Sequence, residues 1–111
     1  MQESLKSIKL ISELTGFILK AGGKEVDINF KDEENKIKIM VKSKIKNLQD
    51  EDLEALKALN TERQSEVEDY YWELAGENDN YQELTLVGMI IDKAEYYYEN
   101  EILKIIVYRH K

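Results

Sequence analysis

The chain contains no cysteine and a single histidine, and these shortages exclude several kinds of catalytic and metal site. Without cysteine there are no disulfides, no thiolate zinc ligands and no cysteine nucleophile, a composition compatible with a reducing cytosol. The one histidine, His110, lies next to the C-terminus and has no second histidine for a zinc pair or a catalytic dyad. The carboxylates lack the spacing of a calcium-binding loop. We therefore expect neither a metal nor a cofactor.

Long apolar runs and an excess of positive charge are also missing. No apolar stretch approaches the length that crosses a bilayer, and the first ten residues, MQESLKSIKL, lack the features of a signal peptide. The 16 basic and 23 acidic residues give a net charge of -7 and alternate along the chain. This charge would repel a phosphate backbone and an anionic lipid surface. We expect a cytoplasmic protein that binds neither nucleic acid nor membrane.

The length of 111 residues suits a single domain, 1–111, with one hydrophobic core. A first helix is predicted over residues 3 to 21, because apolar residues recur there at helical spacing, and Gly22 and Gly23 end it. The apolar stripe consists of Leu5, Ile8, Ile11, Leu14, Ile18 and Ala21, widened by Leu10 and Phe17. Alternating apolar and polar residues then predict two strands joined by the turn 32–35, a first hairpin.

The second half of the chain predicts helices followed by a second hairpin. The segment QDEDLEALKALN has acidic residues in its first turn and leucines on one side, so we expect a helix there. Another helix should run from Thr61 to Gly76, where a capping box and a terminal glycine bound an apolar stripe. The apolar stretch ELTLVGMIID suits a buried strand or a buried helix, and we favour a helix. Residues 94–110 are rich in β-formers around the turn 99–101.

These elements predict an α+β fold, a two-layer sandwich in which two β-hairpins form one sheet with helices on one face. The order is helix, strand, strand, three helices, strand, strand. The other face of the sheet should be partly open. In the second hairpin, Leu103, Ile105 and Val107 should point to the helices, which leaves Ile106, Tyr108 and one or two of Tyr96, Tyr97 and Tyr98 pointing outward.

This order of elements, read with the stretch LISELTGFILKAGGKEVDINF, resembles the ATP-binding domain shared by sensor histidine kinases and gyrase-type ATPases. The resemblance covers nearly the whole chain and implies a bacterial protein. Glu13 fits the glutamate that activates water in the gyrase-type members, but Phe17 stands where the magnesium-binding asparagine belongs. The remaining motif positions also depart from the family: Ser43 replaces the adenine-reading aspartate, and Ile45, Asn47, Glu83 and Thr85 replace glycines of the phosphate loops.

These departures argue jointly against ATP chemistry, because a side chain such as that of Ile45 blocks the close approach of backbone amides to a phosphate. We expect the lysines of VKSKIKN to be solvated and Glu13 to be a surface residue. Glu13 is a candidate general base only if the nucleotide site works. The run DYYWELAG is the strongest unusual feature. Tyr70 and Tyr71 lie on an apolar stripe and Trp72 lies off it, so that Trp72 either packs under a neighbouring helix or joins Arg63 in a recognition surface.

The sequence therefore favours a non-catalytic interaction or regulatory module with a degenerate ATPase-like fold. The alternative is a nucleotide or small-ligand binding domain with an altered pocket and at most weak ATPase activity. The expected interaction surface is Arg63, Tyr70, Tyr71, Trp72, Tyr97, Ile106 and Tyr108. Outward apolar residues on the second hairpin also suggest a homodimer through the open sheet face, unless a loop such as ENDNY covers a central C-terminal strand.

Overall fold

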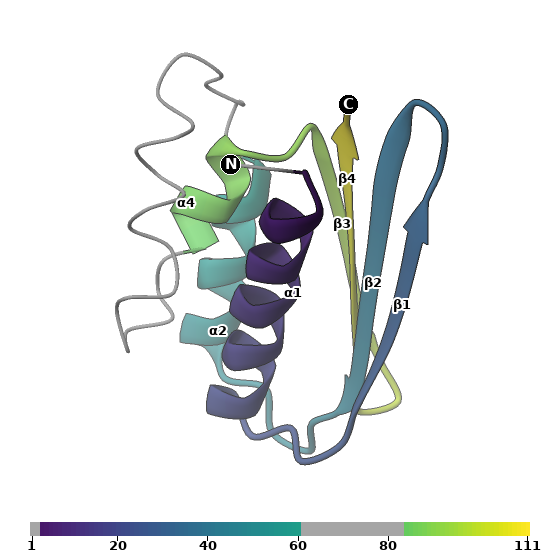
Figure 1. The fold of residues 1–111 in the computed structure, drawn as a ribbon. Coiled ribbons are helices and arrows are strands. Elements are labelled where there is room, and N and C mark those ends of the chain that lie inside the picture. Colours follow the sequence, from purple (N-terminus) through teal and green to yellow (C-terminus); the bar gives the residue numbers. More distant parts are fainter. Residues whose placement is uncertain (1–2, 61–83) are drawn as a thin grey trace.

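The computed structural model describes residues 3–60 and 84–111, and all elements named below lie in these two ranges. In chain order they are α1 (Glu3–Lys20), β1 (Val26–Asp32), β2 (Lys36–Lys44), α2 (Asp50–Lys57), the 3-10 turn η1 (Ala58–Asn60), α4 (Leu84–Met89), β3 (Lys93–Glu99) and β4 (Ile102–His110) (Figure 1). The predicted helix from Thr61 to Gly76 and the loop ENDNY lie outside the described residues.

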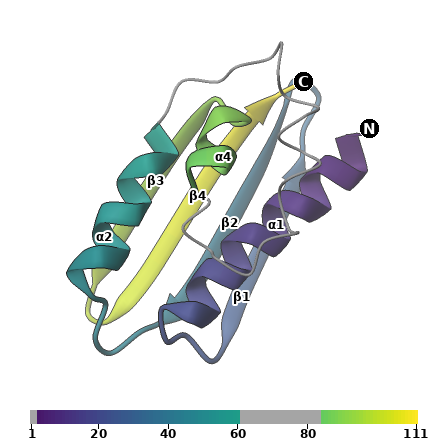
Figure 2. The same cartoon turned by 90° about the vertical axis from the view of Figure 1, so that its left-hand side faces the viewer.

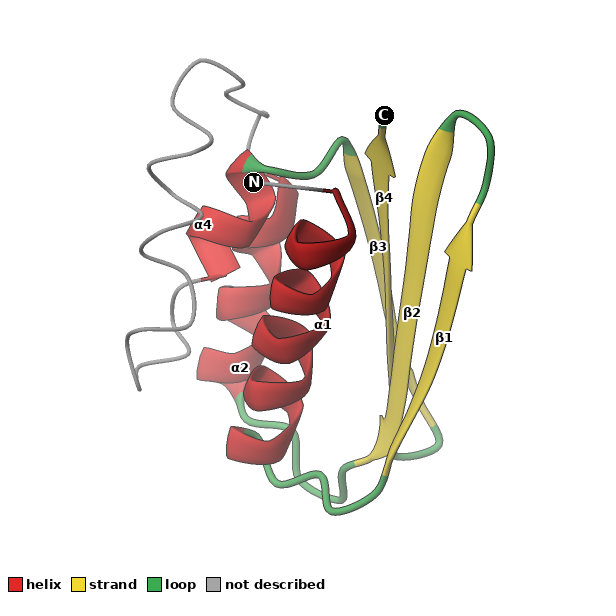
Figure 3. Cartoon of the chain, in the orientation of Figure 1, coloured by secondary structure: helices red, strands yellow, loops and turns green. Residues whose placement is uncertain are grey.

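The four strands form one antiparallel sheet in the order β1-β2-β4-β3. Both predicted hairpins are present, and the two C-terminal strands of the hairpins, β2 and β4, meet in the middle. The described helices all lie on one face of the sheet and leave the other face open (Figure 3). α1 lies over the β1–β2 half, and α2 and α4 lie over the β3–β4 half (Figure 2). The predicted α+β two-layer sandwich is confirmed.

The end of α1 is built by the predicted glycine pair. Gly22 has a φ of 111°, which a residue with a Cβ adopts only with strain. The N–H of Gly23 donates to the carbonyl of Ile18 at 2.9 Å, and that of Gly22 donates to Leu19 at 3.2 Å. These two bonds are the pattern of a Schellman motif, which satisfies carbonyls that the helix end leaves free. The chain thus turns from α1 directly into β1.

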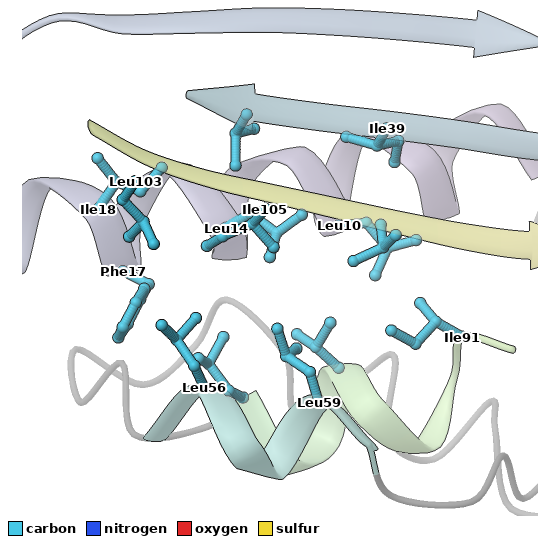
Figure 4. Packing of buried hydrophobic residues seen from close by; sticks show 14 of the residues in the cluster. Leu10, Leu14, Phe17, Ile18, Ile39, Leu56, Leu59, Ile91, Leu103 and Ile105 are labelled. Atoms are coloured by element: carbon cyan, nitrogen blue, oxygen red, sulfur yellow. The ribbon is translucent and has the colours of Figure 1, made fainter. Parts of the chain in front are cut away.

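The core lies between the sheet and the helices (Figure 4). Leu10, Leu14 and Ile18 of α1 face Ile39 of β2 and Ile105 of β4, and all five side chains are at most 1% exposed. The prediction for the first turns of α1 is wrong, because Leu5 is 50% and Ile8 60% exposed. α1 is rolled so that Ser7 and Glu13 are buried in their place, and Ile8 lies towards the flank of β1.

The ambiguous apolar stretch contains a short helix, as predicted. α4 approaches η1 so closely that a Cβ added at Gly88 would lie 2.4 Å from the carbonyl oxygen of Ala58. Leu84, Val87, Ile90 and Ile91 are all at most 1% exposed. Burial on several sides explains why the stretch is nearly continuously apolar, and why its periodicity alone could not separate helix from strand.

Candidate interaction surface

The open face of the sheet is defined by the strand residues that point away from the helices. Paired residues share a face, so the register gives its members. They include seven lysines but only three carboxylates. The lysines are Lys31, Lys36, Lys38, Lys42, Lys44, Lys93 and Lys104, and the carboxylates are Asp27, Glu95 and Glu99. Between them lie Asn29, Met40, Tyr97, Ile102, Ile106, Tyr108 and His110.

Tyr108 is at the centre of the most basic part of the open face. The ammonium nitrogens of Lys36, Lys38 and Lys93 lie 5.5, 5.9 and 5.7 Å from the centre of its ring. A cation at this range is attracted by the electron-rich ring. The lysines come from β2 and β3, on either side of β4, so the sheet order itself brings them together. One aromatic ring therefore holds three positive charges close to one another.

A short polar chain orders the β3 side of the open face. The Tyr97 hydroxyl donates to Glu95 at 2.8 Å, and the Lys93 ammonium lies 3.1 Å from the other carboxylate oxygen. The hydrogen bond from Tyr97, followed by that from Lys93, lowers the pKa of Glu95 below its ordinary value. The same hydrogen bonds raise the pKa of Tyr97 and of Lys93. Glu95 is thus held as a carboxylate, with Lys93 charged and Tyr97 protonated at neutral pH.

The predicted surface residues on the second hairpin do lie together. Tyr97, which is 49% exposed, and the half-buried Ile106 and Tyr108 all belong to the open face. Arg63, Tyr70, Tyr71 and Trp72 lie outside the described residues. The lysines of VKSKIKN were expected only to be solvated, and no lysine was assigned to an interaction surface. The alternation of lysines in β2 was the available signal, and only the strand order adds Lys31, Lys93 and Lys104 to it.

Three of the positions that the resemblance assigns to ATPase motifs, Phe17, Ser43 and Ile45, have structural roles in this fold. Phe17 is 3% exposed and belongs to the core. The Ser43 hydroxyl donates to the Glu25 carbonyl at 2.7 Å, and the Ile45 amide donates to the Glu101 carbonyl at 2.7 Å. The loop amide and hydroxyl are therefore engaged within the fold. Glu83 lies outside the described residues, and Thr85 is part of α4.

Glu13 is buried, not on the surface as expected. Its side chain is only 5% exposed, beside the apolar stripe of α1. Phe17, one helical turn along at the position that the resemblance assigns to a magnesium ligand, is a buried aromatic residue. Within residues 3–60 and 84–111, no group of three or more His, Cys, Asp or Glu side chains could hold a metal ion.

The loop VKSKIKN, which the resemblance makes a phosphate loop, does border a hollow. This hollow of about 480 Å³ lies between the loop after α1 and the loop after β2, and its lining includes Lys24, Lys44 and Lys46. Ile45 and Ala21 contribute apolar surface to the same lining. The lining therefore has a net positive charge, since Glu25 opposes only one of the three lysines, but VKSKIKN lacks the glycines that a phosphate cradle needs.

None of the helices in the described part of the chain is long and apolar enough to cross a membrane. Comparison with protein-family models, with curated proteins and with solved structures gives no match for this chain. The resemblance to the histidine-kinase and gyrase-type ATPase domain stays a prediction.

Proposed function

We propose that this protein is a non-catalytic interaction or regulatory module of the bacterial cytoplasm, with a degenerate ATPase-like fold, and that its open face binds an acidic protein surface. The observation that carries the proposal is that seven lysines share one face of the sheet with Tyr97 and Tyr108, and that three of them surround the ring of Tyr108. Tyrosine supplies contact area with a polar tip, and complementary charge speeds association and selects the partner.

The acidic net charge of the chain does not oppose this proposal. In the sequence, residues 61–83 hold eight of the 23 acidic residues and one of the 16 basic residues, which accounts for the whole net charge of -7. The rest of the chain is balanced in charge, so the basic face is offset by acidic residues elsewhere on the same body. Two open faces pressed together would set lysines against lysines, so a partner of opposite charge suits this face better than a second copy.

A protein partner suits the face better than a nucleic acid does. Asp27, Glu95 and Glu99 lie among the lysines of the face and would repel phosphates. A protein partner can pair basic side chains with these carboxylates. The ring of Tyr108 is surrounded by three ammonium groups, which leaves it less available for stacking with a base. Met40 and Ile106 add apolar area in the middle of the face.

The binding test uses two labelled probes, a poly-glutamate peptide and a single-stranded oligothymidylate, measured by fluorescence anisotropy. The test variant is Lys38→Glu with Lys104→Glu on the open face. The control is Lys24→Glu with Lys46→Glu, which changes the net charge equally off that face. We expect the peptide to bind the wild type and the control, and to bind the open-face variant roughly tenfold more weakly. Tighter binding of the oligonucleotide, or no binding of either probe, would overturn the proposal.

A second candidate, a nucleotide or small-ligand binder, is favoured by the hollow beside Lys24, Lys44 and Lys46. Calorimetry with ATP and ADP, with and without magnesium, separates it from the interaction module. We expect no binding, because Phe17, Ser43 and Ile45 are used by the fold. Micromolar binding of ATP that Lys24→Glu with Lys46→Glu removes would establish this second candidate in place of the first.

A further inference from the structure

The edge of the sheet at β1 presents a row of backbone groups that no described strand pairs. The Glu33 N–H donates to the Lys36 carbonyl at 2.9 Å, at the turn end of the β1–β2 ladder. Hydrogen-bonded and non-hydrogen-bonded pairs alternate in an antiparallel ladder. Hence Asp27, Asn29 and Lys31 bond to β2. The alternate residues of β1, Val26, Ile28, Phe30 and Asp32, direct their N–H and C=O groups away from the sheet.

The hydrogen bonds between β2 and β4 show the same alternation of bonded residues. There the Ile45 amide donates to Glu101 and the Lys111 amide donates to Asn35, so the odd-numbered residues of β2 bond to β4. The even-numbered residues of β2 are left to bond to β1. The two ladders therefore agree on which groups of β1 point outward.

The outward residues of β1 also carry exposed apolar side chains. Ile28 and Phe30 are 46% and 43% exposed, although they share the helix-side face with the buried Val41 and Ile39. A hollow of about 310 Å³ between α1 and this edge is lined in part by Ile8 and Phe30. The N-terminal turns of α1 extend beyond β1, so an added strand would lie beneath them (Figure 2).

Edge strands are normally protected by proline, by a bulge, by an inward charge or by a covering element. β1 has seven residues in unbroken register with β2 and no proline. Its helix-side residues in mid-strand, Ile28 and Phe30, are uncharged. Such an edge is a template for one more antiparallel strand.

We propose that the occupant is β1 of a second copy of this chain, paired antiparallel about a twofold axis at Asn29. This register overlaps all seven residues of both strands. It sets Asp27 of each copy opposite Lys31 of the other, so the open face gains two pairs of opposite charge. On the helix side it sets Ile28 of each copy opposite Phe30 of the other. The outward N–H and C=O groups of Ile28 and Phe30 then meet each other.

The charges select this register over its neighbours. A slip of two residues in either direction shortens the ladder, sets Asp27 or Lys31 opposite Asn29, and so removes the opposite-charge pairs formed within β1. A slip of one residue would move every side chain to the wrong face. A twofold contact must be self-complementary, and the β1 sequence VDINFKD meets this condition around its own centre. Both open faces then lie on one side of a continuous sheet, which extends the basic surface.

The test is the mass measured by light scattering after gel filtration, over a series of concentrations, for the wild type and for charge variants. Asp27→Lys and Lys31→Asp each replace two opposite-charge pairs with two like-charge pairs, and the double variant Asp27→Lys with Lys31→Asp restores opposite charges. We expect each single variant to dimerise roughly tenfold more weakly than the wild type, and the double variant to recover most of the loss. Circular dichroism confirms that each variant is folded.

Ile106→Glu, on the open face far from the β1 edge in strand order, is the matched control and should dimerise like the wild type. The proposal is overturned by a monomeric wild type at high micromolar concentration, by single variants that dimerise normally, or by a double variant that stays as weak as the single ones. A dimer that only Ile106→Glu disrupts would place the contact on the open face instead. This inference does not depend on the partner proposed for that face.

Discussion

The two edge strands of the sheet have the same length and opposite surroundings. β3 is seven residues long, and its helix-side residues Ala94, Tyr96 and Tyr98 are half-buried and pack against the core. β1 is also seven residues long, yet Ile28 and Phe30 on its helix side are largely exposed. The helices of residues 3–60 and 84–111 cover the β3 edge and leave Ile28 and Phe30 of the β1 edge exposed. An edge strand can be covered by its own fold, as β3 is, or by a partner strand, as we propose for β1.

A side-chain hydrogen bond helps to hold the β3 edge, which we call the closed edge, in place; the β1 edge is the open edge. The Tyr98 hydroxyl reaches across to donate to the Ile45 carbonyl at 2.6 Å, and so ties β3 to the loop that leaves β2. At the β1 edge the corresponding helix-side residues are the exposed Ile28 and Phe30. Such side chains make no hydrogen bonds, and they would be buried only by contact with further apolar surface.

The largest loss of stability should come from a change that disturbs the contact between α4 and η1, in the helix layer over β3 and β4 (Figure 2). Gly88→Ala would put a Cβ 2.4 Å from the Ala58 carbonyl oxygen, where backbone has to move. We expect a loss of about 3 kcal/mol in the free energy of unfolding, measured by urea denaturation. Lys57→Ala is the control. It removes only an exposed ion pair to Glu54 and should leave the free energy of unfolding nearly unchanged. Equal effects of the two changes would contradict the close approach.

The tyrosine bond at the closed edge should contribute measurably to stability. Tyr98→Phe leaves the Ile45 carbonyl without its hydroxyl donor, and we expect a loss of about 1 to 2 kcal/mol. Tyr97→Phe, in the next position of the same strand, removes an exposed bond to Glu95 and should leave stability nearly unchanged. Tyr97→Phe should instead raise the pKa of Glu95 towards its ordinary value, as an NMR titration would show. A Tyr98→Phe variant as stable as the wild type would mean that the edge is closed by packing alone.

The hairpin turn that joins β3 to β4 contains two residues other than glycine with positive φ angles, so a glycine there should raise the stability of the protein. Asn100 and Glu101 have φ angles of 53° and 65°, the two positive values of a type I′ turn. Glycine takes the second of these positions without strain, so Glu101→Gly should raise the unfolding free energy by about 0.5 to 1 kcal/mol. Glu99→Gly, at the end of β3, should lower it. Thermal melts of the two variants check both signs, and a destabilising Glu101→Gly would refute the turn type.

The open edge should tolerate a change that the closed edge would not. Phe30→Lys places a charge on a side chain that is 43% exposed, and we expect the free energy of unfolding of the dilute protein to fall by less than about 1 kcal/mol. The same change should abolish dimerisation, because an inward charge protects an edge from added strands. A variant that is unfolded, or one that still dimerises like the wild type, would contradict this account of β1.

The sequence predicted the described elements well because each is dictated by neighbours in the chain. Gly22 and Gly23 ended α1 as expected, and alternation in β2 and β4 gave the inward and outward residues correctly. Leu5 and Ile8 were assigned to the core in error. Periodicity finds the apolar side of a helix, but the roll of α1 is set by what packs on each flank, which is a property of the whole fold.

The candidate surface could be predicted only in part, for a similar reason. Tyr97, Ile106 and Tyr108 were recognised because they break the alternation of the second hairpin. The basic character of the surface depends on β4 lying between β2 and β3, which brings Lys36, Lys38 and Lys93 around one ring. Strand order is a long-range property that local spacing does not encode. Glu13 was expected on the surface because it is charged, and it is buried. Whether a residue is covered depends on the packing of the whole fold, which local sequence does not give.

The most direct test of the open edge is amide hydrogen exchange along β1, measured by NMR on a dilute and on a concentrated sample. Asn29 and Lys31 bond to β2, so their amides should be protected at both concentrations. The amides of Ile28 and Phe30 point outward and should exchange rapidly in the dilute sample. If a second β1 pairs there in the proposed register, these two amides should become protected as the concentration rises, together with the outward amides of Val26 and Asp32 at the strand ends. Rapid exchange of Ile28 and Phe30 at every concentration would contradict the account.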